Sequence, residues 1–319
     1  MRGERASLGA DAALLAVTAV WGLTFTAVQR ALETAGPFSF LAARFALGAG
    51  VLLLVFPRGV LRISRSTLLV SLLLGFWLAA GYGLQTVGLV YTTASKSAFI
   101  TGLCVILVPI FSLALSRVRP RWSSLAAVVL AASGLYLLTA PGSLGLNLGD
   151  LLTLGCAFAF AVHIVIAERV APRHDAAPLA FWQIVTTAVI STTLMGTVEG
   201  PRLPLNRWTV SALGITGVLA TAVAFAVQMW AQRRTSATHV AVIFTAEPVF
   251  AALFSWLIQH ELLGASGLVG GGLIITGILV AQVGARPRSA GREGAEVEGG
   301  SVAREEAFSE GPAGPGGEP

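Results

Sequence analysis

Residues 83–101 read GLQTVGLVYTTASKSAFIT, and parts of this stretch return in the second half of the chain. At an offset of 143 positions, Gln85 aligns with Gln228 and Thr92 aligns with Thr235. Self-similarity at a fixed offset is the sequence signature of a repeated architecture. The stretch therefore predicts that the chain is built from two related halves.

Flanking segments extend the correspondence at nearby offsets. The matched pairs are Trp21 with Phe160, Gly22 with Ala161 and Pro109 with Pro248 at 139, Pro37 with Pro178 and Phe40 with Phe181 at 141, and Ala94 with Ala237 and Gly134 with Gly277 at 143. The drift in offset corresponds to about one helical turn of extra sequence. The halves therefore repeat each other along most of their length.

The composition is that of a membrane protein. Only 12% of the 319 residues are charged and 55% are hydrophobic, with a mean hydropathy of +0.78. A soluble domain carries about 25% charged residues, so a soluble globular enzyme is excluded. One membrane-spanning helix requires roughly 20 apolar residues. We expect ten such helices in an all-α integral membrane protein, at 8–29, 37–56, 67–91, 96–116, 122–140, 149–168, 177–198, 208–231, 237–259 and 262–283.

The cations predict the orientation of these spans. With the N-terminus in the cytoplasm, the inside loops hold Arg2, Arg5, Arg58, Arg62, Arg65, Arg117, Arg119, Arg121, Arg169, Arg173, Arg233 and Arg234, and the outside loops hold Arg30, Lys96, Arg202 and Arg207. Cytoplasmic loops carry an excess of Lys and Arg. Both termini are therefore expected inside.

The C-terminal segment 285–319 has a different composition. It is rich in Gly, Pro, Ala and Ser, and its seven Glu outnumber its four Arg. Such a segment cannot bury enough apolar surface to fold. We expect a disordered cytoplasmic tail.

Each half, 8–140 and 149–283, contains five predicted spans. Because five is odd, the second half would enter the membrane upside down relative to the first. Inverted repeats of this kind are typical of secondary transporters, which alternate access around a site near the middle of the membrane. The pattern favours a transporter built from two inverted five-helix repeats.

Several motifs resemble EamA-type proteins of the drug/metabolite transporter superfamily. The run 83–95, then Ala98 to Thr101 and Val108-Pro109, is similar to that family's third and fourth helices, and Trp21-Gly22 with Phe25 matches its first. Residues 231–238 leading to 247–252 resemble its eighth and ninth helices. The resemblance covers about residues 8–283. It implies a ten-helix bundle with a central cavity that moves amino acids, nucleotide-like metabolites and related small molecules without ATP hydrolysis.

Two isolated charges lie inside predicted spans. Glu247 is near the middle of the ninth span, where a charge costs at least about 2.5 kcal/mol. It could bind a substrate amine or couple transport to protons, or it could be a structural carboxylate beside backbone freed by Pro248. Arg44 lies in the second span. It could clamp a substrate carboxylate, pair with a carboxylate such as Glu247, or reach carbonyls at a helix end.

Polar and aromatic side chains supply further candidates. Gln85 and Gln228 are repeat-equivalent and could line a cavity or join helices, while His163 could relay protons or pack as a hydrogen-bonded histidine. The deeply placed Trp21, Phe25 and Trp182 could form cavity walls or pack between helices. Pro109 and Pro248 are expected to kink their helices.

No cofactor, metal or nucleic acid is expected. Although the pI is near 10.0, the cations are dispersed and form no basic stripe. Cys104 and Cys156 lie in apolar runs without metal-ligand spacing, and no nucleotide-binding or hydrolase motif is present. Gly267 and Gly271 allow close helix approach, either within the bundle or in a homodimer.

The predicted function is a secondary transporter, with export as the favoured direction, for small metabolites such as amino acids or related amphipathic compounds. It would span the plasma (inner) membrane and work by alternating access. The alternatives are a non-transporting scaffold or sensor that binds partners through the acidic tail, and an intramembrane enzyme acting on lipid-like substrates. An enzyme is the less favoured alternative because the ionisable residues within the spans are isolated.

Overall fold

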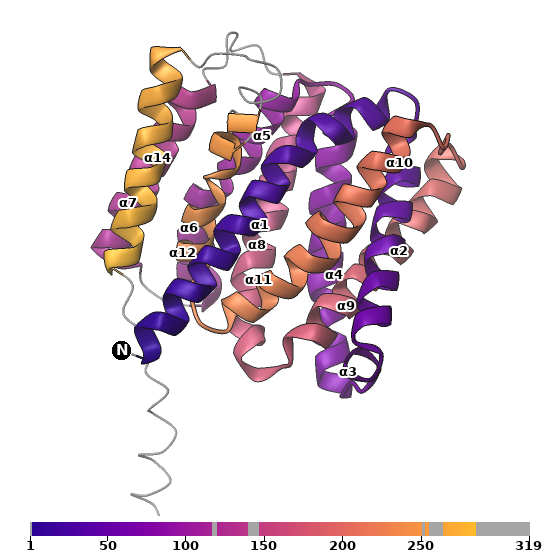
Figure 1. Ribbon diagram of the computed structural model, residues 1–319, viewed down its shortest axis with the longest axis horizontal. Coiled ribbons are helices and arrows are strands. Elements are labelled where there is room, and N and C mark those ends of the chain that lie inside the picture. The colour runs from indigo at the N-terminus through magenta and orange to yellow at the C-terminus, as the bar shows by residue number, and fades with distance from the viewer. Residues whose placement is uncertain (1, 117–119, 140–146, 251–252, 255–263, 285–319) are drawn as a thin grey trace, which may run out of the picture. The chain divides into compact units, whose positions relative to one another are not determined.

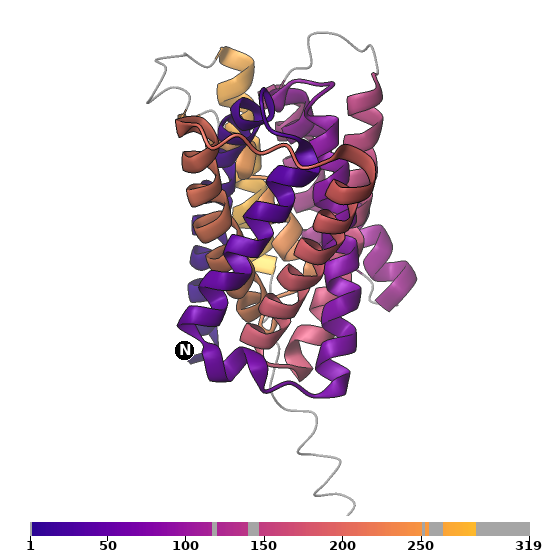
Figure 2. The ribbon, with the colours of Figure 1, turned by 90° about the vertical axis from the view of Figure 1, so that its right-hand side faces the viewer.

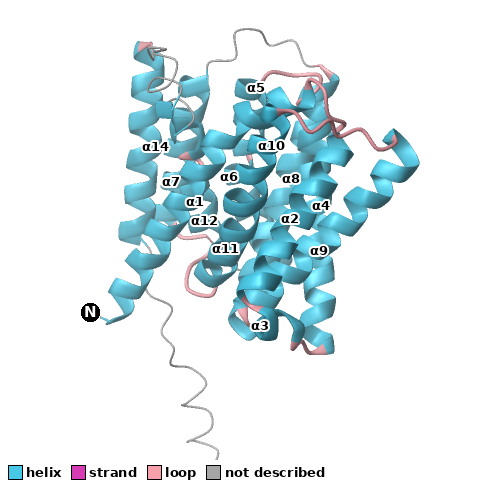
Figure 3. Ribbon diagram, turned by 45° about the vertical axis from the view of Figure 1, so that its right-hand side comes forward, coloured by secondary structure: helices cyan, strands magenta, loops and turns pink. Residues whose placement is uncertain are grey.

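The computed structural model describes residues 2–116, 120–139, 147–250, 253–254 and 264–284. The predicted disordered tail at 285–319 lies outside these residues, as does the end of the predicted ninth span. All described residues belong to one compact unit. They form helices joined by short turns and loops (Figure 3).

The helices follow the predicted spans closely (Figure 1). The first half contains α1 (Arg2–Leu32), α2 (Pro37–Val55), α3 (Pro57–Leu61), α4 (Arg65–Gly88), α5 (Ala94–Gly102), α6 (Cys104–Ser116) and α7 (Trp122–Thr139). The second contains α8 (Leu148–Val170), η1 (Ala171–Arg173), α9 (Ala176–Leu194), η2 (Met195–Glu199), α10 (Arg207–Leu213), η3 (Gly214–Val223), α11 (Ala224–Gln232), α12 (Ala237–Phe244) and α14 (Ala265–Gly284). η1 is a 3₁₀-helix, and η2 and η3 are π-helices.

The all-α membrane fold is confirmed. Seven helical segments of the described residues are long and apolar enough to cross a membrane, and three shorter apolar helices, at 122–137, 237–250 and 265–281, accompany them. Their long axes run broadly alongside one another (Figure 2). The count of ten crossings stays a prediction, because the three shorter helices have 10–17 residues.

Side-chain caps fix where several helices begin. The hydroxyl of Thr93 accepts a hydrogen bond from the Lys96 amide at the start of α5, and that of Ser236 accepts one from the His239 amide at the start of α12. These two caps are 143 residues apart, which is the repeat offset. Ser, Thr and Asn are favoured at such positions because they satisfy amides that lack a partner in the helix.

Both halves contain a broken helix at equivalent places. α5 ends at Gly102 and α6 begins at Cys104, while α12 ends at Phe244 and the helix resumes at Glu247 after a turn. Pro248 lacks the amide that would bond to the Phe244 carbonyl, whereas Pro109 lies inside α6. Discontinuous helices are frequent where transporters bind substrates.

The last helices of the two halves, α7 and α14, pack along each other (Figure 1). A side chain at Gly134 would meet the Gly270 carbonyl and Ile274 amide. A side chain at Gly277 would meet the carbonyl of Ala127 and the amide of Ala131. The repeat offset of 143 relates each residue of one contact to its counterpart in the other. The absence of a Cβ at both glycines therefore lets the two helices approach symmetrically.

Candidate functional site

A cavity of about 80 Å³ lies between elements of both halves. A single water needs roughly 10–15 Å³ measured in this way, so the cavity has room for several waters or a small solute. Eight residues singled out in the sequence line it: Trp21, Phe25, Arg44, Gln85, His163, Gln228, Glu247 and Pro248. They come from six of the predicted spans. The fold thus gathers residues that are up to 227 positions apart.

Arg44 is the buried cation of the cavity, with 4% of its surface exposed. Its Nε donates to Thr221 Oγ1 at 2.9 Å, and its Nη2 donates to the Tyr82 hydroxyl at 3.3 Å and the Ala220 carbonyl at 3.4 Å. The guanidinium also lies 4.5 Å from the centre of the Tyr82 ring. These contacts join α2 to α4 and to η3.

The π-helix η3 supplies the anchor for this side of the cavity. Its Ala220 carbonyl accepts a hydrogen bond from Trp21 Nε1 at 2.9 Å and a longer one from Arg44. A regular α-helix would use that carbonyl internally, whereas π-helical turns change the backbone pairing and are frequent at functional sites. Trp21 and Arg44, from different helices of the first half, are thereby fixed to one carbonyl of the second half.

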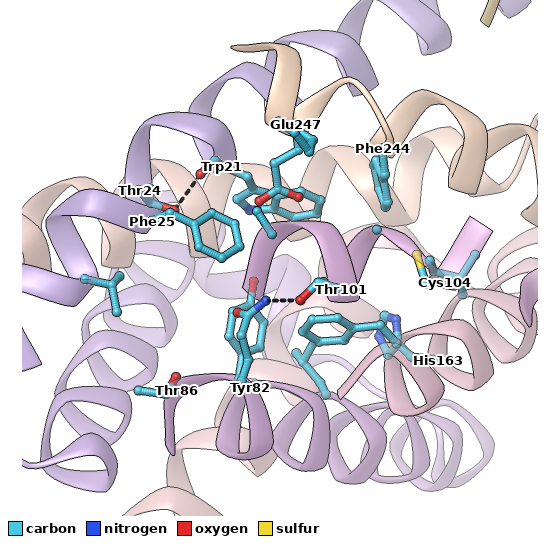
Figure 4. Close-up of a pocket in the computed structure, with 18 of the residues that line it drawn as sticks. Trp21, Thr24, Phe25, Tyr82, Thr86, Thr101, Cys104, His163, Phe244 and Glu247 are labelled. Atoms are coloured by element: carbon cyan, nitrogen blue, oxygen red, sulfur yellow. Dashed lines mark hydrogen bonds between the residues drawn. The ribbon is translucent and has the colours of Figure 1, made fainter. Parts of the chain in front are cut away.

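Glu247 is the acidic residue of the cavity. It follows the break after α12, and its carboxyl group points into the cavity (Figure 4). Glu247 and Arg44 are near enough to attract each other electrostatically. Among the described residues, however, no direct ion pair joins them, and Arg44 uses neutral oxygens as its hydrogen-bond acceptors. The cavity therefore holds a basic and an acidic side chain that are not paired directly with each other.

The two repeat-equivalent glutamines both line the cavity. Gln85 Nε2 donates to Thr101 Oγ1 at 3.2 Å, and Gln228 Nε2 donates to Gln232 Oε1 at 3.1 Å. His163 also lines the cavity, and its Nε2 lies 2.8 Å from Gln183 Oε1. The histidine is thus hydrogen-bonded, as the packing interpretation expects, while its ring remains part of the cavity wall.

Trp182 and Pro109 do not line this cavity. The Trp182 indole donates from Nε1 to the Val60 carbonyl at 3.0 Å, and its ring contacts Phe181 edge to face. Trp182 lies on the face of α9 that turns toward the end of α3. The sequence does not predict this, because the hydropathy of a span does not indicate which side of the helix faces a cavity. For Trp182 the structure therefore supports the packing interpretation.

Four further aromatic residues complete the wall: Tyr82, whose type makes it a candidate from the sequence, and Phe160, Phe225 and Phe244, which were not among the candidates. Trp21 meets Phe244 edge to face at 4.9 Å, and Tyr82 meets Phe160 at 5.1 Å. The repeat offers a signal for one of them, since Phe160 occupies the position equivalent to Trp21. The other phenylalanines carry no signal that separates them from packing residues.

Comparison with known proteins identifies the family. The family model described as "EamA-like transporter family" matches residues 8–140 and 147–282. The chain belongs to the EamA-like transporter family. This EamA-like protein is 33% identical over 278 residues to an uncharacterized transporter of Archaeoglobus fulgidus, with 86% of this chain and 85% of that protein covered. It is 25% identical to the uncharacterized transporter YoaV of Bacillus subtilis, with 84% and 94% covered.

A solved structure shares the fold of this EamA-like chain. The crystal structure matches with a TM-score of 0.73 at 20% identity, covering 88% of this chain and 96% of the other. The family model and the relatives confirm the resemblance to EamA-type proteins, and the chain is a multi-pass membrane transporter. The relatives' names specify no substrate.

Proposed function

We propose that this EamA-like transporter exports small metabolites such as amino acids or related amphipathic compounds by alternating access, across the plasma (inner) membrane with both termini in the cytoplasm. The observation that carries the proposal is the cavity between elements of the two halves, with Arg44 and Glu247 among aromatic walls. A metabolite with a carboxylate, an amine and an apolar side chain complements these three features. Among the described hydrogen bonds Arg44 Nη1 takes no part, which leaves donors for a carboxylate.

Two polar pairs join the halves at opposite ends of the bundle and support alternating access. His239 Nε2 lies 3.0 Å from Asp11 Oδ1, with both side chains buried, between α12 and α1. Lys96 Nζ lies 2.7 Å from Asp150 Oδ2, between α5 and α8. Figure 1 shows α5 at one end of the helices, and the turn before α12 at the other.

These pairs occupy repeat-equivalent positions. Asp11 corresponds to Asp150 at the offset of 139, and Lys96 corresponds to His239 at 143. If the halves rock against each other, opening one end breaks one pair while the other pair holds the far end closed. The two states then differ in contacts that ligand binding can bias. The two pairs thus act as end latches, one at each end of the bundle.

Uptake into proteoliposomes tests the proposal. A panel of amino acids and other small metabolites is offered with and without an imposed pH gradient, to wild type and to Glu247→Gln. We expect at least one compound to accumulate with the gradient, and Glu247→Gln to lose that accumulation, because the amide cannot bind and release a proton.

The matched control is Thr276→Ala, whose side chain is exposed on α14 and, among the described residues, donates to the Gly272 carbonyl of its own helix. Equal transport by wild type and Glu247→Gln, without dependence on the gradient, would make Glu247 structural and the protein a facilitator. Absence of flux for every compound, with a folded protein, would overturn the transport proposal and favour the scaffold.

A further inference from the structure

One polar atom of the cavity wall has no hydrogen-bond partner among the residues that the structure describes. Gln228 is 2% exposed, and among the described residues its Oε1 is a buried acceptor without a hydrogen-bond donor. Most buried polar atoms in native proteins are hydrogen-bonded, so an exception calls for a physical account. The position of Gln228 in the cavity wall suggests that account, because a ligand there can supply the missing donor.

The orientation of the Gln228 amide is determined by its neighbours. Oxygen and nitrogen of a glutamine amide are assigned from their hydrogen bonds. The Ile164 carbonyl can only accept, so the atom of Gln232 that lies 2.9 Å from it must be Nε2. Gln232 Oε1 must then be the acceptor for Gln228, whose own Nε2 donates at 3.1 Å. The free atom of Gln228 is consequently an oxygen.

The amide of the equivalent glutamine in the first half is not held in one orientation. Gln85 contacts Thr101 Oγ1, and a hydroxyl group can both donate and accept. Gln85 can therefore present either end of its amide, whereas Gln228 presents an acceptor only. The second half of the chain therefore provides the part of the cavity wall that prefers a hydrogen-bond donor on the ligand.

Resting on the proposed function, we infer that Gln228 and Gln232 form an acceptor site for an amine group of the transported compound. Gln228 contacts the amine, and Gln232 is a positioning residue that keeps the Gln228 oxygen available. Glu247 lines the same cavity, and in its ionised form its carboxylate favours an ammonium group over a hydroxyl. The ligand class is thus a compound with a primary or secondary amine.

Because the Gln228 oxygen has no partner, the site should discriminate between ligands with and without N–H groups. A site that is arranged to hydrogen-bond a ligand group rejects an analogue without that group, because its own polar atom then stays unpaired. Hydrogen bonds to charged groups are among the stronger ones in proteins. We expect at least about tenfold tighter binding of an ammonium with N–H groups than of one without them.

Two cations of equal charge test the inference: benzylamine, which has N–H donors, and benzyltrimethylammonium, which has none. Their dissociation constants are measured by calorimetry on the purified full-length protein, for wild type, Gln228→Leu and Gln232→Leu. Thr276→Ala is the control. We expect a preference for benzylamine of at least about tenfold in wild type and in the control, falling to about twofold or less in Gln228→Leu.

Gln232→Leu separates hydrogen bonding from size. This variant keeps Gln228 but no longer fixes the orientation of the Gln228 amide. The preference for benzylamine should therefore fall although the cavity wall retains a glutamine. If the bulk of three methyl groups caused the preference, it would persist in both variants, and the inference would be wrong. A wild type that binds neither cation, or both equally, would also overturn it. Proteoliposome flux decides the proposed transport function separately, because it does not depend on these two cations.

Discussion

At the scale of single residues, the site depends on how Arg44 is held. Its guanidinium has acceptors in Thr221 for Nε and in Tyr82 and Ala220 for Nη2. The planar guanidinium presents five donors in a fixed arrangement, while a lysine ammonium is a compact point charge. Charge alone therefore does not define this position; the shape of the cation does.

Arg44→Lys is expected to lower the initial rate of transport in proteoliposomes at least about tenfold. Lysine cannot reach the three acceptors at once, and each hydrogen bond to a charged group contributes about 1.5–3 kcal/mol. Thr221→Val removes the Nε acceptor alone and should lower the rate less. The matched control, Thr216→Val, removes a hydroxyl that bonds within its own helix segment, and it should transport as wild type. A wild-type rate for Arg44→Lys would contradict the assigned role.

Sequence reasoning reaches some of these residues and misses others for physical reasons. Arg44 and Glu247 are identifiable because charge is expensive within a span. Phe225 and Phe244 are not, since the same hydrophobic character serves for packing and for cavity walls. For Trp182 the sequence predicts a place inside a span but not the face of the helix on which it lies. Residue type and depth can be predicted from sequence; the direction of a side chain around its helix depends on tertiary packing.

At the scale of helices, the spans are predictable because lipid demands that backbone groups pair within the segment. The π-helical pairing of η3 leaves no comparable mark in the sequence, since GITGVLATAV is mainly apolar, as the sequence of a regular membrane helix is. The contact between α7 and α14 lies between these cases. The repeat pairs Gly134 with Gly277, but only the structure reveals that each glycine touches the backbone of the other helix.

Gly134→Ala and Gly277→Ala are expected to lower the thermal unfolding temperature in detergent. The added methyl meets backbone atoms, and overpacking of a core typically costs about 1–3 kcal/mol. Gly272→Ala, also on α14, has open space around its site. Because alanine favours a helix over glycine by roughly 1 kcal/mol, this control should retain or raise the unfolding temperature. Equal effects at all three glycines would show that the close approach is unimportant.

At the scale of the whole molecule, the end latches give the halves two contacts of similar geometry and different chemistry. One contains a lysine and the other a histidine, although their aspartates are repeat-equivalent. The polar partners could not be predicted individually, because Asp11 and His239 are separated by 228 positions. The repeat alignment supplies the missing relation once one pair is known.

Asp150→Asn and Asp11→Asn are expected to expose the cavity from opposite sides. Cys104 lines the cavity, so in a Cys156→Ala background it reports access to a membrane-impermeant thiol reagent. Leaving a buried polar group without its partner costs about 1–3 kcal/mol, and about 1.4 kcal/mol corresponds to a tenfold rise in the labelling of Cys104. Asp150→Asn should increase labelling from outside the cell, and Asp11→Asn should increase labelling from the cytoplasmic side of inverted vesicles. Increases from the same side in both variants would contradict the latch assignment.

The contact between α7 and α14 has one more consequence. Each of its glycines meets residues that precede the other glycine on the facing helix, and the repeat offset relates the two sets of residues. This reciprocity is the property of an isologous interface, such as joins the two copies in a symmetric dimer. A boundary inside one polypeptide thus has the form of a boundary between two molecules. Two fragments made by dividing the chain within 140–146 should therefore recognise each other through it. Co-expression of the fragments and co-purification through a tag on one of them would measure that association, and Gly277→Ala should weaken it.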